Sequence, residues 1–200
     1  MNDEEKNKIK KLAYFFFEIG NLRKIPRAHQ QTLLFQDLSD NIASHSFRTT
    51  FIGYFLAKEL NADADKVMKM CLLHDIEETR SGDQNWIHKR YIKSFEDQIR
   101  KEQLGEFDAA KELLSISNEY DERKTLESKI AKDADLLDEI FLLREYEWQG
   151  SKEASEWLAH GKDNEQESLL FTDLAKEIAK EAKTQKPSDW WQNLWTPKRR

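Results

Sequence analysis

Cys71-Leu72-Leu73-His74-Asp75-Ile76-Glu77-Glu78-Thr79 sets an imidazole and a carboxylate on adjacent residues of an otherwise apolar helical stretch. Two such polar groups are costly to remove from water unless another group compensates them. A divalent metal is the natural compensation, because histidine nitrogens and carboxylate oxygens are both metal ligands. A second histidine, His45, lies on an earlier apolar segment, and Asp135 on a later segment is a candidate fourth ligand. This spaced set predicts a metal centre.

The composition favours a single, largely helical domain. The chain has 200 residues, enough for a sizeable hydrophobic core, and only 6 glycines and 3 prolines. Its net charge of -6 and its pI near 5.5 argue against a nucleic-acid polymer or an anionic membrane as the main partner. A nucleotide substrate therefore requires a local cationic pocket. The lone cysteine, Cys71, excludes an intrachain disulfide, and its apolar neighbours predict a buried thiol.

The sequence contains no apolar run long enough to cross a membrane as a helix. The N-terminus begins Met1-Asn2-Asp3-Glu4-Glu5, which is acidic and lacks the pattern of a secretory signal. We therefore expect a soluble protein located in the cytoplasm.

Hydrophobic periodicity and helix-ending residues predict a series of helices. Gly20 ends the first, Gly82 ends the third, and Gly105 interrupts the region that follows. Pro26 lies in a long connection over residues 21–43, and a charged stretch, residues 151–167, precedes the last helix. We expect the tail, residues 187–195, to fold back onto the body, because exposed tryptophan is costly. The expected helices cover residues 4–20, 44–60, 63–79, 86–120 in one or two pieces, 124–149 and 168–183.

Helical spacing places the candidate ligands on apolar faces. His45 and His74 each continue a stripe of apolar residues, and Asp135 lies at the edge of another. Asp133 and Asp138 compete with Asp135 as ligand. Otherwise, we expect them on the solvated side of their helix or in a supporting position behind a ligand. The remaining histidines lie in polar surroundings and are interpreted as surface residues; they are His29, His88 and His160.

These motifs resemble those of the HD-domain metal-dependent phosphohydrolase superfamily and, within it, the small 5'-deoxynucleotidase group. The resemblance covers about residues 5–183 and implies an all-α, single-domain HD-domain helical bundle. We expect one domain over residues 1–200, with core motifs at 21–147 and a C-terminal helix and tryptophan-rich tail at 166–200, of which the tail is not part of the core motif. The resemblance also implies a single divalent metal ion held by His45, His74, Asp75 and Asp135. The matching segments are residues 22–27, 42–48, 73–78, 82–83, 132–138 and 145–147.

The resemblance further assigns roles around the metal. Arg27 matches the arginine that binds the substrate phosphate, a task that suits a bidentate guanidinium. Glu78 matches an acid beside the attacking water or the leaving oxygen, and Asp83 matches a second acid that orients water or the sugar. Two further cations are candidates from their positions. Lys89 either adds charge to the pocket or lies on the surface, and Arg48 pairs with a ligand carboxylate or reaches the phosphate.

The sequence departs from the family pattern at two places. Ser44 stands where an acidic residue usually precedes the first metal histidine, and no aromatic residue follows Arg27 in Ala28-His29-Gln30. The metal and phosphate groups are retained, so recognition of the base or sugar is the feature in question. His29 is one residue that would offer a ring in place of the absent aromatic residue.

The leading hypothesis is a metal-dependent phosphomonoesterase that acts on (deoxy)nucleoside 5'-monophosphates. The alternatives are a non-catalytic nucleotide-sensing or interaction module and a phosphatase for a non-nucleotide phosphate ester. The mixed ligand set admits Mn, Co, Fe, Ni, Zn or Mg. A homodimer is common in the resembling group, and the apolar segments would serve one.

Overall fold

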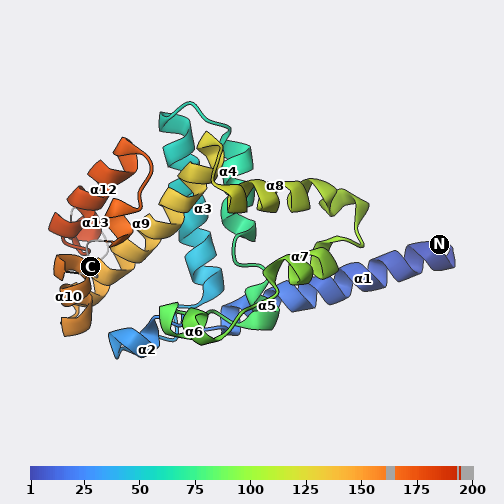
Figure 1. Ribbon diagram of the computed structural model, residues 1–200, viewed down its shortest axis with the longest axis horizontal. Helices are drawn as coiled ribbons and strands as arrows, with labels where there is room; N and C mark the ends of the chain where they lie inside the picture. Colours follow the sequence, from blue (N-terminus) through green and yellow to red (C-terminus); the bar gives the residue numbers. More distant parts are fainter. Residues whose placement is uncertain (161–164, 193, 195–200) are drawn as a thin grey trace.

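The computed structural model describes residues 1–160, 165–192 and 194. These residues fold into helices joined by turns, and one isolated β-bridge pairs Pro26 with Asn41. The predicted all-α fold is confirmed for this part of the chain (Figure 1). The helices are, in chain order, α1 (Asp3–Ile19), η1 (Gly20–Lys24), α2 (Gln30–Leu33), α3 (Ile42–Glu59), α4 (Ala64–Leu73), α5 (Glu78–Ser81), α6 (Trp86–Tyr91), α7 (Glu96–Leu104), η2 (Asp108–Ala110), α8 (Lys111–Glu122), α9 (Leu126–Trp148), α10 (Lys152–His160), α11 (Glu165–Ser168), α12 (Asp173–Thr184) and α13 (Asp189–Gln192).

Three helices, α3, α4 and α9, pack against one another at the centre of the molecule (Figure 1). A side chain caps the N-terminus of each, because Asn41, Asp63 and Thr125 accept the backbone N–H three residues further on. Such caps satisfy amide groups that a helix end leaves without partners. Apolar side chains from the three helices form the main core; they include Leu56, Val67, Met70, Ile130 and Leu137.

Helices α3 and α4 approach each other closely at Gly53. A Cβ atom added there would lie 2.7 Å from Cys71 Sγ and 2.9 Å from Val67 Cγ1. Cys71 is fully buried, as the sequence predicts. The missing side chain at Gly53 therefore lets the helices that lead to His45 and His74 pack at short range.

The prediction for the third helix is wrong at its C-terminal end. α4 ends at Leu73, His74 is its C-cap residue, and α5 begins only at Glu78. Between them the chain tightens, because the Ile76 amide donates to the Leu73 carbonyl and the Glu78 amide to the Asp75 carbonyl. The apolar spacing continues through this turn, so periodicity alone did not separate the two helices.

The long connection before α3 is ordered by polar contacts to Asp40. The His29 ring nitrogen Nε2 lies 2.7 Å from Asp40 Oδ2, and the Gln30 side-chain amide donates to the Asp40 carbonyl oxygen. Burial raises the pKa of Asp40, but the hydrogen bond and charge of His29 outweigh it and leave that pKa lowered. The prediction that His29 is a surface residue is wrong, because its ring is buried against this carboxylate.

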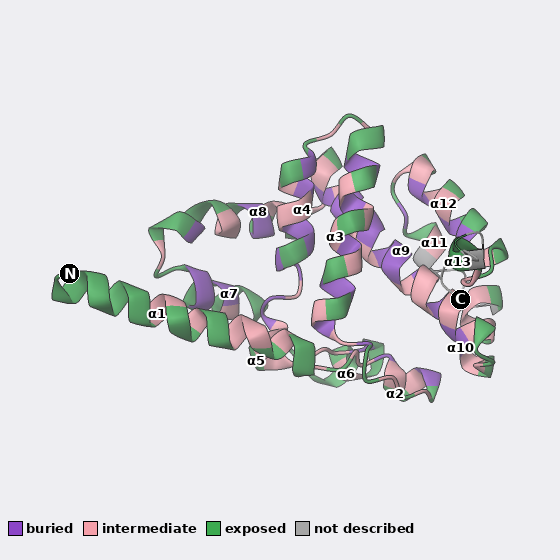
Figure 2. Cartoon of the chain, turned by 180° about the vertical axis from the view of Figure 1, so that it is seen from behind, coloured by how far each residue is buried: buried purple, intermediate pink, exposed green. Residues whose placement is uncertain are grey.

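Helix α1 lies on the outside of the molecule, and none of its residues is fully buried (Figure 2). It contacts the rest of the chain through Phe15, whose ring centroid lies 5.6 Å from that of Phe107, and through Glu18, which pairs with Arg80. The region 86–120 is interrupted near Gly105, as predicted. It nevertheless forms α6, α7, η2 and α8 instead of one or two helices.

The C-terminal helices are attached to α9 through Asp133. Its fully buried carboxylate accepts hydrogen bonds from the Phe171 amide and from the amide and hydroxyl of Thr172, at 2.6–2.9 Å. Asp133 therefore lies neither in solvent nor behind a metal ligand, because it holds the N-terminus of α12. The charged stretch 151–167 forms α10 and part of α11.

The tryptophan-rich tail does not pack as expected at its first two tryptophans. Trp190 and Trp191 are 72% and 50% exposed, and their rings contact each other with centroids 4.9 Å apart. Trp195 and the side chain of His160 lie outside the described residues, so the predictions for them are untested. His88 is partly buried, which corrects its placement on the surface.

The outer face of α3 carries an apolar stripe. Phe47, Phe51 and Phe55 follow one another at successive turns, and each is more than half exposed. None of the helices in the described part of the chain is both long and apolar enough to cross a membrane.

We expect Gly53→Ala to lower the free energy of unfolding by about 1–3 kcal/mol, because the added methyl group overlaps Cys71 and Val67. Gly20→Ala is the matched control, since nothing lies within 4 Å of a Cβ atom there and its φ of -61° suits alanine. Urea unfolding of both variants measures the difference. Equal stabilities would contradict the close approach of α3 and α4.

Candidate active site

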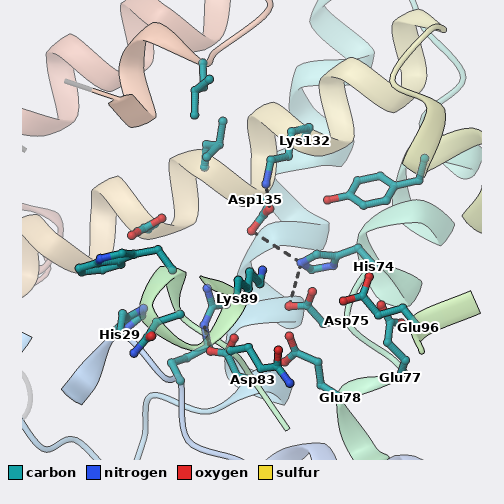
Figure 3. A pocket seen from close by; sticks show the side chains of 18 of the residues that line it. His29, His74, Asp75, Glu77, Glu78, Asp83, Lys89, Glu96, Lys132 and Asp135 are labelled. Atoms are coloured by element: carbon teal, nitrogen blue, oxygen red, sulfur yellow. Dashed lines mark hydrogen bonds and ion pairs between the residues drawn. The ribbon is translucent and has the colours of Figure 1, made fainter. Parts of the chain in front are cut away.

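Four side chains from three regions of the chain converge between α3, α4 and α9, and Figure 3 shows three of them, His74, Asp75 and Asp135. The Nε2 atoms of His45 and His74 lie 3.0 Å apart. Asp75 Oδ2 is 3.2 Å from His74 Nε2, and Asp135 Oδ1 is 3.2 Å from His45 Nε2. The ligand atoms of His45, His74 and Asp135 all lie within 4.8 Å of one another. The residues that the sequence singled out as a metal set are thus brought together.

The other ring nitrogen of each histidine fixes its tautomer. His45 Nδ1 lies 2.6 Å from Asp138 Oδ2, and His74 Nδ1 lies 2.8 Å from the Cys71 carbonyl oxygen. Both partners accept hydrogen bonds, so each Nδ1 carries the proton. Each Nε2 is then the nitrogen left to bind a cation, either a proton or a metal ion. Nearby carboxylates raise the pKa of both rings and so favour positive charge at this place.

The charges around the centre favour a cation in the same place. Burial opposes the charged form of His74, but Asp75 and Asp135 raise its pKa well above the usual value. Burial would raise the pKa of Asp135, yet Lys132 and the two histidines bring it well below its usual range. Two imidazoles and two carboxylates form a mixed nitrogen and oxygen donor set that fits Mn, Fe, Co, Ni or Zn.

Asp138 supports the centre from behind His45. Its other carboxylate oxygen accepts a 2.5 Å hydrogen bond from Arg48 Nε, and Arg48 also donates to Glu145. Asp138 is thus in the supporting position that the sequence left open for it. Arg48 pairs with Asp138 and Glu145, which are outside the proposed ligand set, and it does not line the cavity in front of the centre.

A cavity of about 750 Å³ opens in front of the centre. Its volume lies in the range of small-molecule sites, roughly 300–1,000 Å³. Arg27, Glu78, Asp83 and Lys89 all line it, and Figure 3 shows Glu78 and Asp83 on the side of Asp75 away from Asp135. The Lys89 side chain is exposed at the cavity wall, so it reaches both solvent and the cavity.

Arg27 presents a buried cation to this cavity. Its side chain is 13% exposed, and its Nε lies 3.4 Å from Asp83 Oδ2. Nε and Nη1 are buried and have no hydrogen-bond partner among the described residues. Burial opposes the charge, but Asp75, Asp83 and Asp135 raise the pKa of the guanidinium. Unsatisfied buried donors are costly, so an anionic ligand that accepts from Arg27 would be stabilised here.

Glu78 is a carboxyl group that retains its proton. Burial, together with the charges of Asp75 and Asp83, raises the pKa of Glu78 to about 10. Its Oε2 atom is buried without a hydrogen-bond partner. A protonated carboxyl beside a cationic centre has a proton to donate, and a cation bound at the centre would lower its pKa. The group is therefore suited to acid–base chemistry.

Several residues around the site were not found from the sequence. Glu77 and Arg100 form a buried ion pair at 3.1 Å, and burial raises the pKa of Glu77 to about 7. Nothing in the sequence indicated that Arg100 is buried, because most residues of α7 are polar or charged. Lys132 pairs with Asp135 at 2.7 Å, and its i, i+3 spacing on a helix was a signal that could have been used. The cavity is also lined by aromatic side chains; they are Tyr120, Trp86 and Trp157.

A family model described as an HD domain matches residues 19–181. The chain belongs to the HD-domain family. It is also 30% identical over 126 residues to the 5'-deoxynucleotidase HDDC2 of Dictyostelium discoideum. That match covers 56% of this chain and 66% of the relative.

Solved structures support the HD-domain fold. A conserved hypothetical protein from Pyrococcus furiosus is 27% identical with a TM-score of 0.68, and the alignment covers 84% of this chain and 99% of that one. A predicted metal-dependent phosphohydrolase from Magnetospirillum magnetotacticum MS-1 has a TM-score of 0.65 at 22% identity, with 87% and 90% of the two chains covered. At that identity the likeness concerns the fold alone.

We expect Asp138→Asn to weaken binding of a divalent metal about 10–100-fold, because partners that orient a ligating histidine typically contribute this much. Competition between the protein and a chelating dye for Mn²⁺ measures the affinity. Asp133→Asn is the matched control on the same helix, since Asp133 contacts Phe171 and Thr172 instead of His45. It is expected to lower stability and to leave metal affinity unchanged. Equal affinities of the two variants would argue against this role for Asp138.

We expect Glu78→Gln to make the metal-free protein more stable at alkaline pH. The raised pKa means that folded Glu78 keeps a proton which the unfolded chain loses above its ordinary value of 4.5. The stability of the unsubstituted protein therefore falls, relative to the variant, as the pH rises from 4.5 to about 10. The slope for one proton is at most ~1.4 kcal/mol per pH unit. Urea unfolding in chelator between about pH 5 and pH 9 tests this expectation, and a pH-independent difference would refute it.

Proposed function

We propose that this HD-domain protein is a metal-dependent phosphohydrolase that removes the 5'-phosphate from (deoxy)nucleoside monophosphates. The observation that carries the proposal is the buried guanidinium of Arg27. Two of its donors have no hydrogen-bond partner among the described residues, and it lines the same cavity as His74, Asp75 and Asp135. A group that binds phosphate and a set that binds a metal are thus available to one small molecule.

The metal would be held by His45, His74, Asp75 and Asp135. A divalent cation in this position supplies two things, a lowered pKa for a water molecule and polarisation of the phosphorus centre. The donor types admit Mn, Co, Fe, Ni, Zn or Mg. Asp138 keeps His45 in the tautomer that leaves Nε2 available, and the Cys71 carbonyl does the same for His74.

The other residues bind the phosphate and handle protons. Arg27 donates to the phosphate oxygens, and Lys89 adds positive charge at the cavity wall. Glu78 donates a proton to the leaving oxygen. Burial, Asp75 and Asp83 raise the pKa of its carboxyl, and a cation at the centre would bring that pKa back down toward the range of an acid–base group. Asp83 fixes the backbone next to Arg27, because its carboxylate accepts a 2.7 Å hydrogen bond from the Ala28 amide.

Two observations favour a nucleotide as the phosphate ester. The similar Dictyostelium protein is a 5'-deoxynucleotidase, and the cavity has more room than a phosphate alone requires. A non-nucleotide phosphate ester is the second candidate, because Ala28 leaves no ring beside Arg27 for a base. A module that only binds nucleotide has less need of Glu78 and Asp83, both of which line the cavity.

The same proposal places the protein in the cytoplasm and includes a second copy of the chain as a possible partner. The exposed apolar stripe of Phe47, Phe51 and Phe55 is the surface that such a copy would cover. Measurement of the solution mass of the protein and of Phe51→Glu tests this part by itself.

The main test is phosphate release by metal-stripped protein resupplied with Mn²⁺ or Co²⁺. The substrates are ribo- and deoxyribonucleoside 5'-monophosphates, with sugar phosphates as non-nucleotide esters. We expect metal-dependent release, which is abolished by Asp75→Ala. Phosphate release that is unaffected by Asp75→Ala, or no release from folded and metal-loaded protein, would contradict the proposal.

Arg27→Ala is expected to lower kcat/KM by about 10²–10³-fold, as loss of a buried donor to a reacting oxyanion commonly does. Arg23→Ala is the matched control. Arg23 lies in the same short segment, residues 23–27, but it is exposed and does not line the cavity. Steady-state kinetics on one nucleotide compare the two. Equal losses would show that general positive charge, and not Arg27, binds the phosphate.

A further inference from the structure

The cavity extends from the metal-ligand cluster to a wall made of two tryptophans. Trp86 on α6 and Trp157 on α10 both line it, with ring centroids 5.3 Å apart and ring planes inclined by 56°. The rings are tilted and not stacked face to face, so neither covers the whole face of the other. Trp86 is 46% exposed although it lies in a pocket. The pair therefore presents apolar aromatic surface to whatever fills the cavity.

Hydrogen bonds connect the backbone next to Arg27 with the residues just before Trp86. The Asn85 side-chain amide donates to the Ala28 carbonyl at 3.0 Å, and Asp83 accepts from the Ala28 amide at 2.7 Å. Arg27 precedes Ala28, and Trp86 follows Asn85. The Asn85–Ala28 hydrogen bond therefore lies one residue from Arg27 on one side and one residue from Trp86 on the other.

Helix α9 continues the cavity in the same direction. Asp135, Leu136 and Glu139 all line the cavity. The lining therefore extends about 6 Å along α9, measured from Asp135. Helix α10, which carries Trp157, packs against α9. Leu136 and Leu169 add apolar surface to the cavity lining, and Glu139 adds a carboxyl group. Flat apolar walls with a polar group at the edge match a nucleobase.

The other rings that line the cavity are already covered. The Arg123 guanidinium lies 3.3 Å from the ring centroid of Tyr120, and the His74 ring contacts Tyr120 edge-on. The His29 ring is buried and held by Asp40. Trp86 and Trp157 offer larger rings to the cavity, and Trp86 remains 46% exposed.

We propose that Trp86 and Trp157 form a nucleobase-binding wall, on which the base of a nucleoside monophosphate stacks while its phosphate lies at Arg27. This inference rests on the proposed function and deepens it, because it assigns substrate selection to residues from α6 and α10. Stacking tolerates every base, since each has a flat π-face. The wall therefore selects nucleotides over smaller phosphate esters with little preference among bases.

The test compares a nucleotide with its base-free counterpart, ribose 5-phosphate, in Trp157→Leu and Trp86→Leu. We expect the ratio of kcat/KM for the nucleotide to that for ribose 5-phosphate to fall about tenfold, through KM, as loss of one stacking contact does. Trp157→Phe keeps a ring and should retain most of the ratio. Trp148→Leu is the matched control, because Trp148 lies on α9 outside the cavity and should leave the ratio as it was.

Binding is read separately from turnover by quenching of tryptophan fluorescence with the nucleoside monophosphate. Quenching that is lost in Trp157→Leu and kept in Trp148→Leu supports the wall, even if the wild-type protein releases no phosphate and the proposed hydrolysis fails. Hydrolysis of both esters with an unchanged ratio in the folded leucine variants at Trp86 and Trp157 overturns the wall and leaves the phosphohydrolase proposal standing. Circular dichroism verifies folding, and a misfolded leucine variant at one position leaves the other position to decide.

Discussion

Two imidazole nitrogens, His45 Nε2 and His74 Nε2, face each other at 3.0 Å with their opposite nitrogens already protonated. Carboxylates beside the two nitrogens raise the pKa of both rings, so the arrangement favours a cation, whether a proton or a metal ion. The two rings, together with Asp135, come from the three helices that make the centre of the fold. The core therefore packs around a site that is complete only when positive charge lies between those helices.

The cavity in front of this centre retains polar atoms that the protein itself does not satisfy. Buried donors of Arg27 and a carboxyl oxygen of Glu78 have no partner among the described residues. Folded proteins satisfy most buried polar groups, so such exceptions concentrate where a ligand is expected. By contrast, the charges behind the centre are paired, as in Asp138 with Arg48 and His45. Polar groups behind the centre thus have protein partners, whereas Arg27 and Glu78, which line the cavity, keep polar atoms for a ligand to bind.

The sequence predicted the parts of the structure that depend on local spacing. The periodicity predicted α9, and an adjacent His-Asp pair with His45 singled out residues that the structure brings together. Spacing alone left Asp133, Asp135 and Asp138 open, and the family resemblance favoured Asp135. What failed depended on partners distant in the chain. Asp133 bonds residues 171 and 172, and the Trp86–Trp157 contact joins α6 to α10. The turn after Leu73 failed for another reason, because apolar spacing continues through it.

Asp133 and Asp135 are two residues apart on α9, and their carboxylates have unrelated partners. Asp135 faces the histidines, whereas Asp133 accepts three hydrogen bonds from the start of α12. A chain that ends before Phe171 would leave the buried carboxylate of Asp133 without these partners, within one helical turn of Asp135. An uncompensated buried charge is strongly destabilising. The smallest stable fragment that retains the centre must therefore reach beyond Thr172, which makes α12 part of the folding unit and not an appendage.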